Sequence, residues 1–322
     1  TKAVQVQQKI KQLEKIVPIE IDEVDNSALR LKFPSCLRSG DYPLICDDVR
    51  KDYGEHTVFE HATLTIKRGE KVAFVGKNGE GKATLVKCIM GEIPFAGDLK
   101  IGHNIKIGYF AQNQAQLLDE SLSVFDTIDN VAKGDIRLRI KDILGAFMFG
   151  GEASDKKVKV LSCGERTRLA MIRLLLEPVN LLILDEPTNH LDFSMLNWLE
   201  NYLESYKGAV IIVSHDRYFL NAVASDICEI ENGELVRYKG GYSSFLTQKE
   251  ERIKTLTKEY EKQQREIEDL RDYVRRNLAK SSSINSVGSR VKALEKMELQ
   301  AKPNPKVKDV HISFPFDIEP HK

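Results

Sequence analysis

The chain has little of what marks a membrane or secreted protein. None of its apolar runs approaches the roughly 20 residues of a membrane-spanning helix, and it opens on Thr1, Lys2 and a Gln/Lys-rich pattern instead of a secretory signal. Five dispersed cysteines form no C-x-x-C pair, which argues against a disulfide framework or a zinc site. We therefore expect a cytoplasmic protein with reduced thiols and no membrane partner.

The chain also carries no formal net charge. Lys plus Arg and Asp plus Glu both number 48, so the formal charge is zero. This balance argues against a protein that coats nucleic acid over its whole surface, and it leaves room for a local basic patch.

Short β-rich runs alternate with helical runs from about residue 44 to residue 242, the pattern of an α/β domain. The β-rich runs are Lys71–Gly76, Ile105–Ala111, Leu181–Asp185 and Ala209–Ser214. The division that we predict is the end of a linker helix at 1–20, an acidic, Pro-containing linker at 21–43, the α/β domain at 44–243, a basic helical arm at 244–300 and a tail at 301–322.

The arm has apolar residues stepping by three and four from Ile253 to Val274, a coiled-coil-like seam. A break at Ser281–Ser289 precedes a second helical stretch, so we expect a hairpin. Residues 271–297 carry seven Lys/Arg against two acids, and basic groups there could meet RNA phosphates. The candidates are Arg275, Arg276, Lys280, Arg290 and Lys292. The alternative is a solvated charged helix.

Two sequence pairs repeat at one offset. Residues 8–16 resemble residues 289–297, and residues 31–34 resemble residues 312–315, both 281 residues apart. Chance similarity between charged helices is the alternative. The shared offset predicts one period of an array, cut within its linker.

A glycine-rich loop lies between an apolar strand and a helix that begins near Ala83. Glycines let backbone N–H groups wrap a phosphate, the helix N-terminus adds a favourable dipole, and a lysine reaches the β- and γ-phosphates. The residues predicted to hold the nucleotide here are Gly76, Lys77, Asn78, Gly79, Glu80, Gly81, Lys82, Ala83 and Thr84.

The apolar strand Leu181–Asp185 ends in two acids. Neighbouring strand residues point to opposite faces, so the two carboxylates can do different work. Asp185 suits Mg²⁺ and its waters, and Glu186 suits orienting or deprotonating an attacking water.

Further candidate nucleotide-binding residues lie elsewhere along the chain. Tyr53 offers an aromatic face for adenine, and Gln112 ends a strand where it could sense Mg²⁺ or the γ-phosphate. His215 follows an apolar strand. The segment Leu161-Ser-Cys-Gly-Glu165 precedes a helix and offers Ser162, Gly164 and Glu165 to a phosphate.

Together these residues resemble the ATP-binding cassette family over about residues 44–242. The resemblance implies a P-loop ATPase core with a helical subdomain near 113–178 and an antiparallel β-subdomain. It implies ATP and Mg²⁺ as ligands, with Lys82, Gln112, Asp185, Glu186 and His215 acting in one protomer and Ser162–Glu165 capping the phosphate of another. Residues 185–192, Asp-Glu-Pro-Thr-Asn-His-Leu-Asp, resemble the ABC-F subfamily, whose members pair two cassettes, and several of which act on ribosomes near the peptidyl-tRNA site.

Three features depart from that family. Ala83 stands at the P-loop position of a Mg²⁺-ligating hydroxyl, and Cys163 replaces a glycine of the signature. The part before the Asp185–Asp192 motif resembles a second cassette and the part after it a first, so the chain looks like a mosaic joined there. The hypotheses are an ABC-F ATPase acting on ribosomes, a binding-only or decayed cassette, a transporter ATPase subunit, and a chromosome-organising or repair ATPase.

Overall fold

The computed structural model describes residues 36–111, 114–189, 191 and 193–277. A six-stranded sheet lies at its centre, with strand order β5-β6-β7-β3-β8-β9. The strands are β3 (Lys71–Val75), β5 (Ile107–Phe110), β6 (Leu181–Asp185), β7 (Ala209–Val213), β8 (Asp226–Glu231) and β9 (Glu234–Lys239). All neighbours pair in parallel except β8 and β9. This arrangement confirms the predicted α/β fold.

The apolar strands of this sheet lack alternation because both faces are buried. Val72 and Phe74 of β3 belong to one hydrophobic cluster, whereas Ala73 and Val75 belong to another. Successive side chains on a strand point to opposite faces, so one core lies on each side of the sheet.

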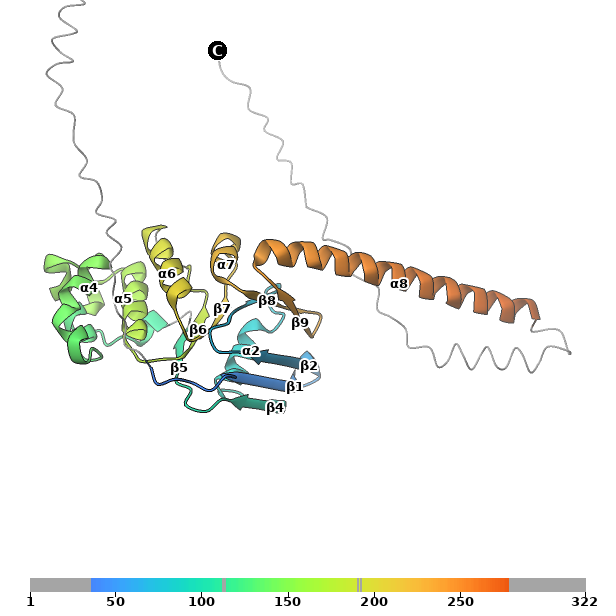
Figure 1. The fold of residues 1–322 in the computed structure, drawn as a ribbon, viewed down its shortest axis with the longest axis horizontal. Coiled ribbons are helices and arrows are strands. Elements are labelled where there is room, and N and C mark those ends of the chain that lie inside the picture. Colours follow the sequence, from blue (N-terminus) through green and yellow to red (C-terminus); the bar gives the residue numbers. More distant parts are fainter. Residues whose placement is uncertain (1–35, 112–113, 190, 192, 278–322) are drawn as a thin grey trace, which may run out of the picture.

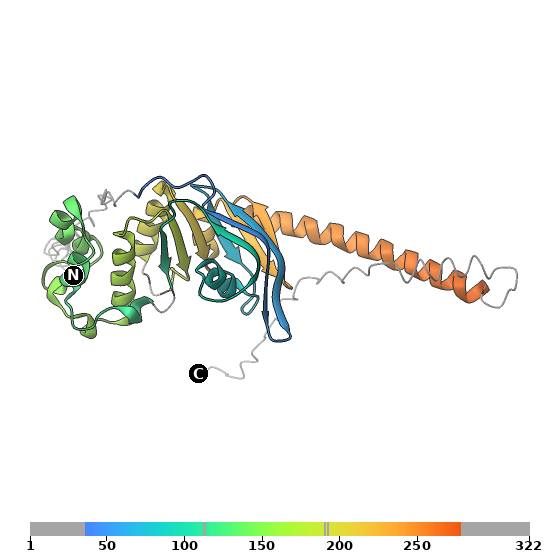
Figure 2. The same ribbon diagram turned by 90° about the horizontal axis from the view of Figure 1, so that it is seen from below.

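A three-stranded antiparallel sheet and helix α2 cover the first face. The sheet has the order β2-β1-β4. Its strands are β1 (Leu44–Tyr53), β2 (His56–Ile66) and β4 (Ala96–Ile101), and α2 spans Lys82–Ile89. Figures 1 and 2 show these elements together on the side of the central sheet away from α5 and α6.

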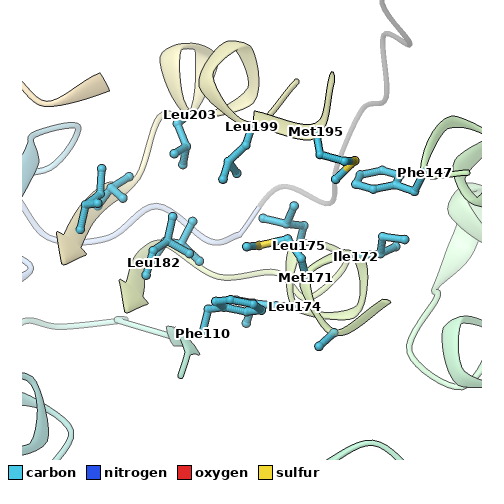
Figure 3. Packing of buried hydrophobic residues seen from close by; sticks show 14 of the residues in the cluster. Phe110, Phe147, Met171, Ile172, Leu174, Leu175, Leu182, Met195, Leu199 and Leu203 are labelled. Carbon is cyan, nitrogen blue, oxygen red and sulfur yellow. The ribbon is translucent and has the colours of Figure 1, made fainter. Parts of the chain in front are cut away.

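The rest of the α/β domain is helical. Its helices are α3 (Val124–Asp129), α4 (Ile140–Ala146), α5 (Cys163–Leu175), α6 (Phe193–Ser205) and α7 (Arg217–Val223). Short 3₁₀ turns lie at Gln114–Leu117, Gly134–Arg139, Gly151–Asp155 and Val158–Val160. In Figure 3, Phe110 and Leu182 of the sheet lie beside Met171 and Leu175 of α5, with Leu199 of α6 above them. Trp198 joins this core to the helical subdomain, because its ring meets Phe147 edge-on at 4.5 Å between centroids.

Helix α8 (Tyr242–Asn277) projects away from the α/β domain (Figures 1 and 2). Its 36 residues correspond to roughly 54 Å at about 1.5 Å per residue. At its base Lys249 forms ion pairs with Glu229 and Glu231, and Phe245 packs edge-on against Tyr238. The expected bend and the return helix of the arm lie outside the described residues, as do residues 1–20 and 301–322.

Several boundaries move by one or two residues from those expected, since β3, β5 and β7 end at the last ladder pair. No helix in the described part of the chain is long and apolar enough to cross a membrane.

Candidate functional site

The loop between β3 and α2 turns tightly, and two of its glycines cannot be replaced without movement. Gly76 has φ +150° and Gly81 has φ +100°, a region that side chains rarely adopt. A Cβ on Gly76 would lie 2.4 Å from the carbonyl oxygen of Ile230, and one on Gly81 would lie 2.5 Å from Cγ1 of Val58. The loop therefore sits between β8 and β2, and it leads directly into the N-terminus of α2.

The Lys82 side chain folds back over this loop. Its Nζ donates to the carbonyl oxygens of Gly76 at 2.8 Å and Lys77 at 2.9 Å. An ammonium has three N–H donors, so one remains for a phosphate oxygen. Burial lowers the pKa of Lys82, and the carboxylates of Glu186, Glu80 and Asp185 oppose that shift.

The two acids at the end of β6, Asp185 and Glu186, both line one cavity instead of pointing to opposite faces of a strand. The strand ends at Asp185, and Glu186 has φ +52°, so the alternation expected from the sequence stops there. The Glu186 N–H donates to the Val213 carbonyl at 2.8 Å, which holds this unusual backbone. Burial raises the pKa of both carboxyl groups.

His215 lies beside Glu186, with 3.5 Å between Nε2 and Oε1. It follows β7, whereas Glu186 follows β6, and these strands are parallel neighbours. Their carboxyl ends consequently bring the two side chains together. The electrostatic effect of His215 lowers the pKa of Glu186, but burial outweighs it.

A cavity of about 530 Å³ joins these parts. Its lining comprises Asn78, Gly79, Gly81, Lys82, Ala83, Thr84, Asp185, Glu186, Asn189, Val213 and His215. The volume lies in the usual range for small-molecule sites. A lysine and a helix N-terminus on one wall, with carboxylates on another, suit a polyphosphate carrying a divalent cation.

The donor set fits Mg²⁺ bound mainly through phosphate and water. In the described residues no cluster of three His, Cys, Asp or Glu could hold a metal ion by itself. Mg²⁺ usually keeps several waters and takes one or two carboxylates plus phosphates. Ala83 lines the cavity without a hydroxyl, and Thr84 lines it one residue later.

The signature segment is separate from this cavity. Ser162 caps α5: its Oγ accepts from the Glu165 N–H at 3.3 Å, and the Ser162 N–H donates to Oε2 of Glu165 at 2.7 Å. These hydrogen bonds with Ser162 lower the pKa of Glu165. Cys163 is exposed at the first helical position, and Gly164 follows it. None of the four lines the cavity with Lys82.

Other predicted residues also lie elsewhere. Tyr53 is half exposed near the tip of the β1–β2 hairpin and does not line the cavity. The carboxylate of Glu80 accepts from the Asn232 N–H at 3.0 Å, which turns it toward the β8–β9 turn. Arg275 and Arg276 are in the last turn of α8, where both pair with Asp272. Gln112, Lys280, Arg290 and Lys292 lie outside the described residues.

The cavity also includes a residue that our sequence analysis did not single out. Asn189 lines it four residues before the start of α6 at Phe193. Nearby, the hydroxyls of Thr188 and Ser214 lie 3.3 Å apart and join the segment after β6 to the segment after β7. The position of Asn189 within the Asp185–Asp192 motif was the available signal.

Two family models, both described as ABC transporter, match residues 59–189 and 228–314. The putative ATP-binding protein YdiF of Bacillus subtilis is 36% identical over 316 residues, covering 84% of this chain and 49% of its own length. ABC transporter F family member 2 of Arabidopsis thaliana is 40% identical over 257 residues, covering 78% of this chain and 38% of its own length. The chain thus spans half or less of these relatives.

Solved structures agree on the fold. The ATP-binding subunit of an ABC transporter aligns with a TM-score of 0.54 at 22% identity, covering 61% of this chain and 89% of that one. A dimeric ATP-binding cassette in a post-hydrolysis state with ADP and Pi aligns with a TM-score of 0.51 at 23% identity, covering 61% of this chain and 98% of that one. With the P-loop, the acidic strand end and His215 around one cavity, the chain belongs to the ABC-F group of ATP-binding cassette proteins.

Proposed function

We propose that this chain binds ATP with Mg²⁺, hydrolyses it, and acts as one cassette of an ABC-F protein at the ribosome. The observation that carries the first two parts is the cavity itself. Lys82, Glu186 and His215 come from three separate elements and converge on it. Relatives named as ATP-binding proteins support the same substrate.

In this proposal the triphosphate of ATP lies against the loop 76–81 and the first turn of α2. Lys82 donates its remaining N–H to the β- and γ-phosphates. Asp185 faces the metal shell, and Gln112 is assigned there by the family motif. A Mg²⁺ ion held there would supply positive charge that offsets the charge developing during phosphoryl transfer.

Glu186 is the proposed general base. Burial raises the pKa of Glu186, which makes its carboxylate a stronger proton acceptor than that of an exposed glutamate. His215, 3.5 Å away, orients the Glu186 carboxylate and contacts the γ-phosphate. The left-handed backbone of Glu186 turns this carboxylate into the cavity.

Binding and turnover are measured separately to test this assignment. Calorimetry with MgATP should show binding by the unchanged chain, and a phosphate-release assay should show turnover. Lys82→Ala should lose both, whereas Glu186→Gln should keep binding and lose turnover. Binding unaffected by Lys82→Ala would refute the assigned site.

A binding-only cassette is the second candidate, and Ala83 favours it. Without the hydroxyl, the metal shell loses one protein ligand on the cavity wall. Binding with no detectable phosphate release by the unchanged chain would select this alternative over hydrolysis.

A second cassette completes the site in this proposal. Ser162–Glu165 lie outside the cavity that holds Lys82, so they are free to cap a phosphate held by another cassette. A related cassette is described as dimeric in its post-hydrolysis state. The partner is a second copy of this chain or a further cassette of a longer protein.

The ribosome is proposed as partner because of the basic arm that follows the cassette. Helix α8 projects from the domain (Figure 2) and ends in Arg275 and Arg276, which are 77% and 74% exposed. Asp272 partly offsets their charge, so Lys280, Arg290 and Lys292 are needed as well. We also propose a cytoplasmic location, since all five cysteines are free thiols.

Ribosome cosedimentation at several salt concentrations tests this part. Charge reversal at Arg275, Arg276 and Lys280 should weaken association and reduce its salt dependence. Unchanged ribosome binding by that variant would refute the RNA-binding role of the arm and favour the alternative of a solvated charged helix.

A further inference from the structure

Lys51 lies against the ring of Tyr53, the residue proposed to stack on adenine. The two residues are two apart on β1, so their side chains share one face of the strand. The Lys51 ammonium lies 4.7 Å from the centroid of the Tyr53 ring, within cation–π distance. Lys51 is 8% exposed, whereas Tyr53 is 51% exposed.

The ammonium is held in place from the side of α2. Its Nζ donates to the carbonyl oxygen of Pro94 at 2.6 Å, in the segment that follows α2. Burial raises the pKa of the Cys88 thiol on α2, and the charge of Lys51 opposes that rise, which places the ammonium near this helix. A lysine this buried needs strong partners, because removing a charge from water is costly.

The same strand pair meets the phosphate-binding loop. Lys51 is the register partner of Phe59 on β2. Phe59 and its neighbour Val58 are the side chains that a Cβ on Gly81 would strike. Lys51 therefore links the hairpin tip that carries Tyr53 to the segment around the start and end of α2.

We propose that Lys51 positions Tyr53 and strengthens base recognition at the nucleotide site. With the ammonium on one side of the ring, the purine stacks on the other side. The cation also draws ring electron density toward itself, which favours an electron-rich adenine on the opposite face. This inference rests on the proposed ATP site. It adds Lys51 as the residue that determines which face of the Tyr53 ring the adenine base stacks on.

The test compares MgATP with magnesium tripolyphosphate by calorimetry, using the full chain with Glu186→Gln so that ATP is not consumed. Tripolyphosphate reports the phosphate cradle alone. Lys51→Met, which keeps the length of the side chain, should weaken ATP about fivefold, equal to about 1 kcal/mol at 1.4 kcal/mol per tenfold. Tripolyphosphate affinity should not change, and Lys100→Met on neighbouring β4 should alter neither ligand.

A double variant separates positioning from packing. Tyr53→Ala should weaken ATP at least as much as Lys51→Met, and adding Lys51→Met to Tyr53→Ala should cause no further loss. Additive losses, equal loss of both ligands, or unchanged ATP affinity of Lys51→Met would each overturn the proposal. If Tyr53→Ala has no effect while ATP still binds, this inference fails and the proposed function stands. If the background protein binds neither ligand, both fail.

Discussion

Replacing Lys249 by methionine should loosen the base of α8, because the buried carboxylate of Glu229 would lose its cationic partner. The Glu229 side chain is only 8% exposed, and its cationic partner is Lys249, itself 24% exposed. Burial raises the pKa of Glu229, and its hydrogen bond to Lys249 opposes that shift. Removing the cation leaves a carboxylate in a poorly hydrated place.

The expected loss in unfolding free energy is about 3 kcal/mol, at the low end of the range for breaking a buried ion pair. The low end applies because the hydroxyl of Tyr238 still donates to Glu229 at 3.4 Å. The loss should depend on pH. A folded-state pKa above the unfolded one stabilises the protein below the unfolded pKa, and that stability disappears as pH rises through the folded pKa. Lys249→Met should therefore be destabilising at neutral pH and nearly neutral in mild acid.

Urea unfolding followed by far-UV circular dichroism and by the fluorescence of Trp198, the one tryptophan of the chain, measures this. Lys249→Met combined with Glu229→Gln should recover most of the loss at neutral pH, because no buried charge remains. Lys100→Met, which removes an exposed pair with Asp98, is the matched control and should cause no measurable change. A loss that is the same at both pH values would refute the reasoning and assign the effect to packing of the lysine stem.

Three further predictions concern the ATP site. Ala83→Ser should raise Mg²⁺-dependent phosphate release several-fold by restoring a hydroxyl on the cavity wall. Thr84→Ser should not change the rate, because residue 84 already carries a hydroxyl. Equal rates for Ala83→Ser and the unchanged chain would show that the missing hydroxyl at position 83 does not limit turnover. Burial raises the pKa of Glu186, so turnover should fall on acidification at a higher pH than an ordinary glutamate would give; a rate profile flat through mild acid would contradict the assignment of the base. In a Glu186→Gln background, Cys163→Gly should increase the ATP-dependent dimer seen by sedimentation, since the thiol at the first position of α5 crowds the approach to phosphate; dimers that form without ATP would point to another surface.

Much of the site was predictable because its parts are local. A strand, a glycine-rich turn, a lysine and a helix follow one another within residues 71–89, and each step depends on near neighbours. The same holds for the strand that ends at Asp185. Parallel strands then bring their carboxyl ends to one edge, so the convergence of Glu186 and His215 follows from the α/β pattern.

Contacts between distant segments were not predictable. The sequence did not predict that the Glu80 carboxylate accepts a hydrogen bond from the backbone N–H of Asn232, 152 residues away. Strand alternation placed Glu186 opposite Asp185, but the hydrogen bond to Val213 on β7 holds Glu186 in a left-handed turn on the same cavity.

Composition and periodicity by themselves determined the α/β class, the order of the nucleotide motifs and the long helix after them, because these depend on residue spacing along the chain. Tertiary structure alone decided that Lys51 lies against the Tyr53 ring and that Lys249 pairs with buried Glu229. A basic residue looks solvent-exposed in a sequence. Its burial is set by which strands and helices pack around it, and no local pattern records that packing.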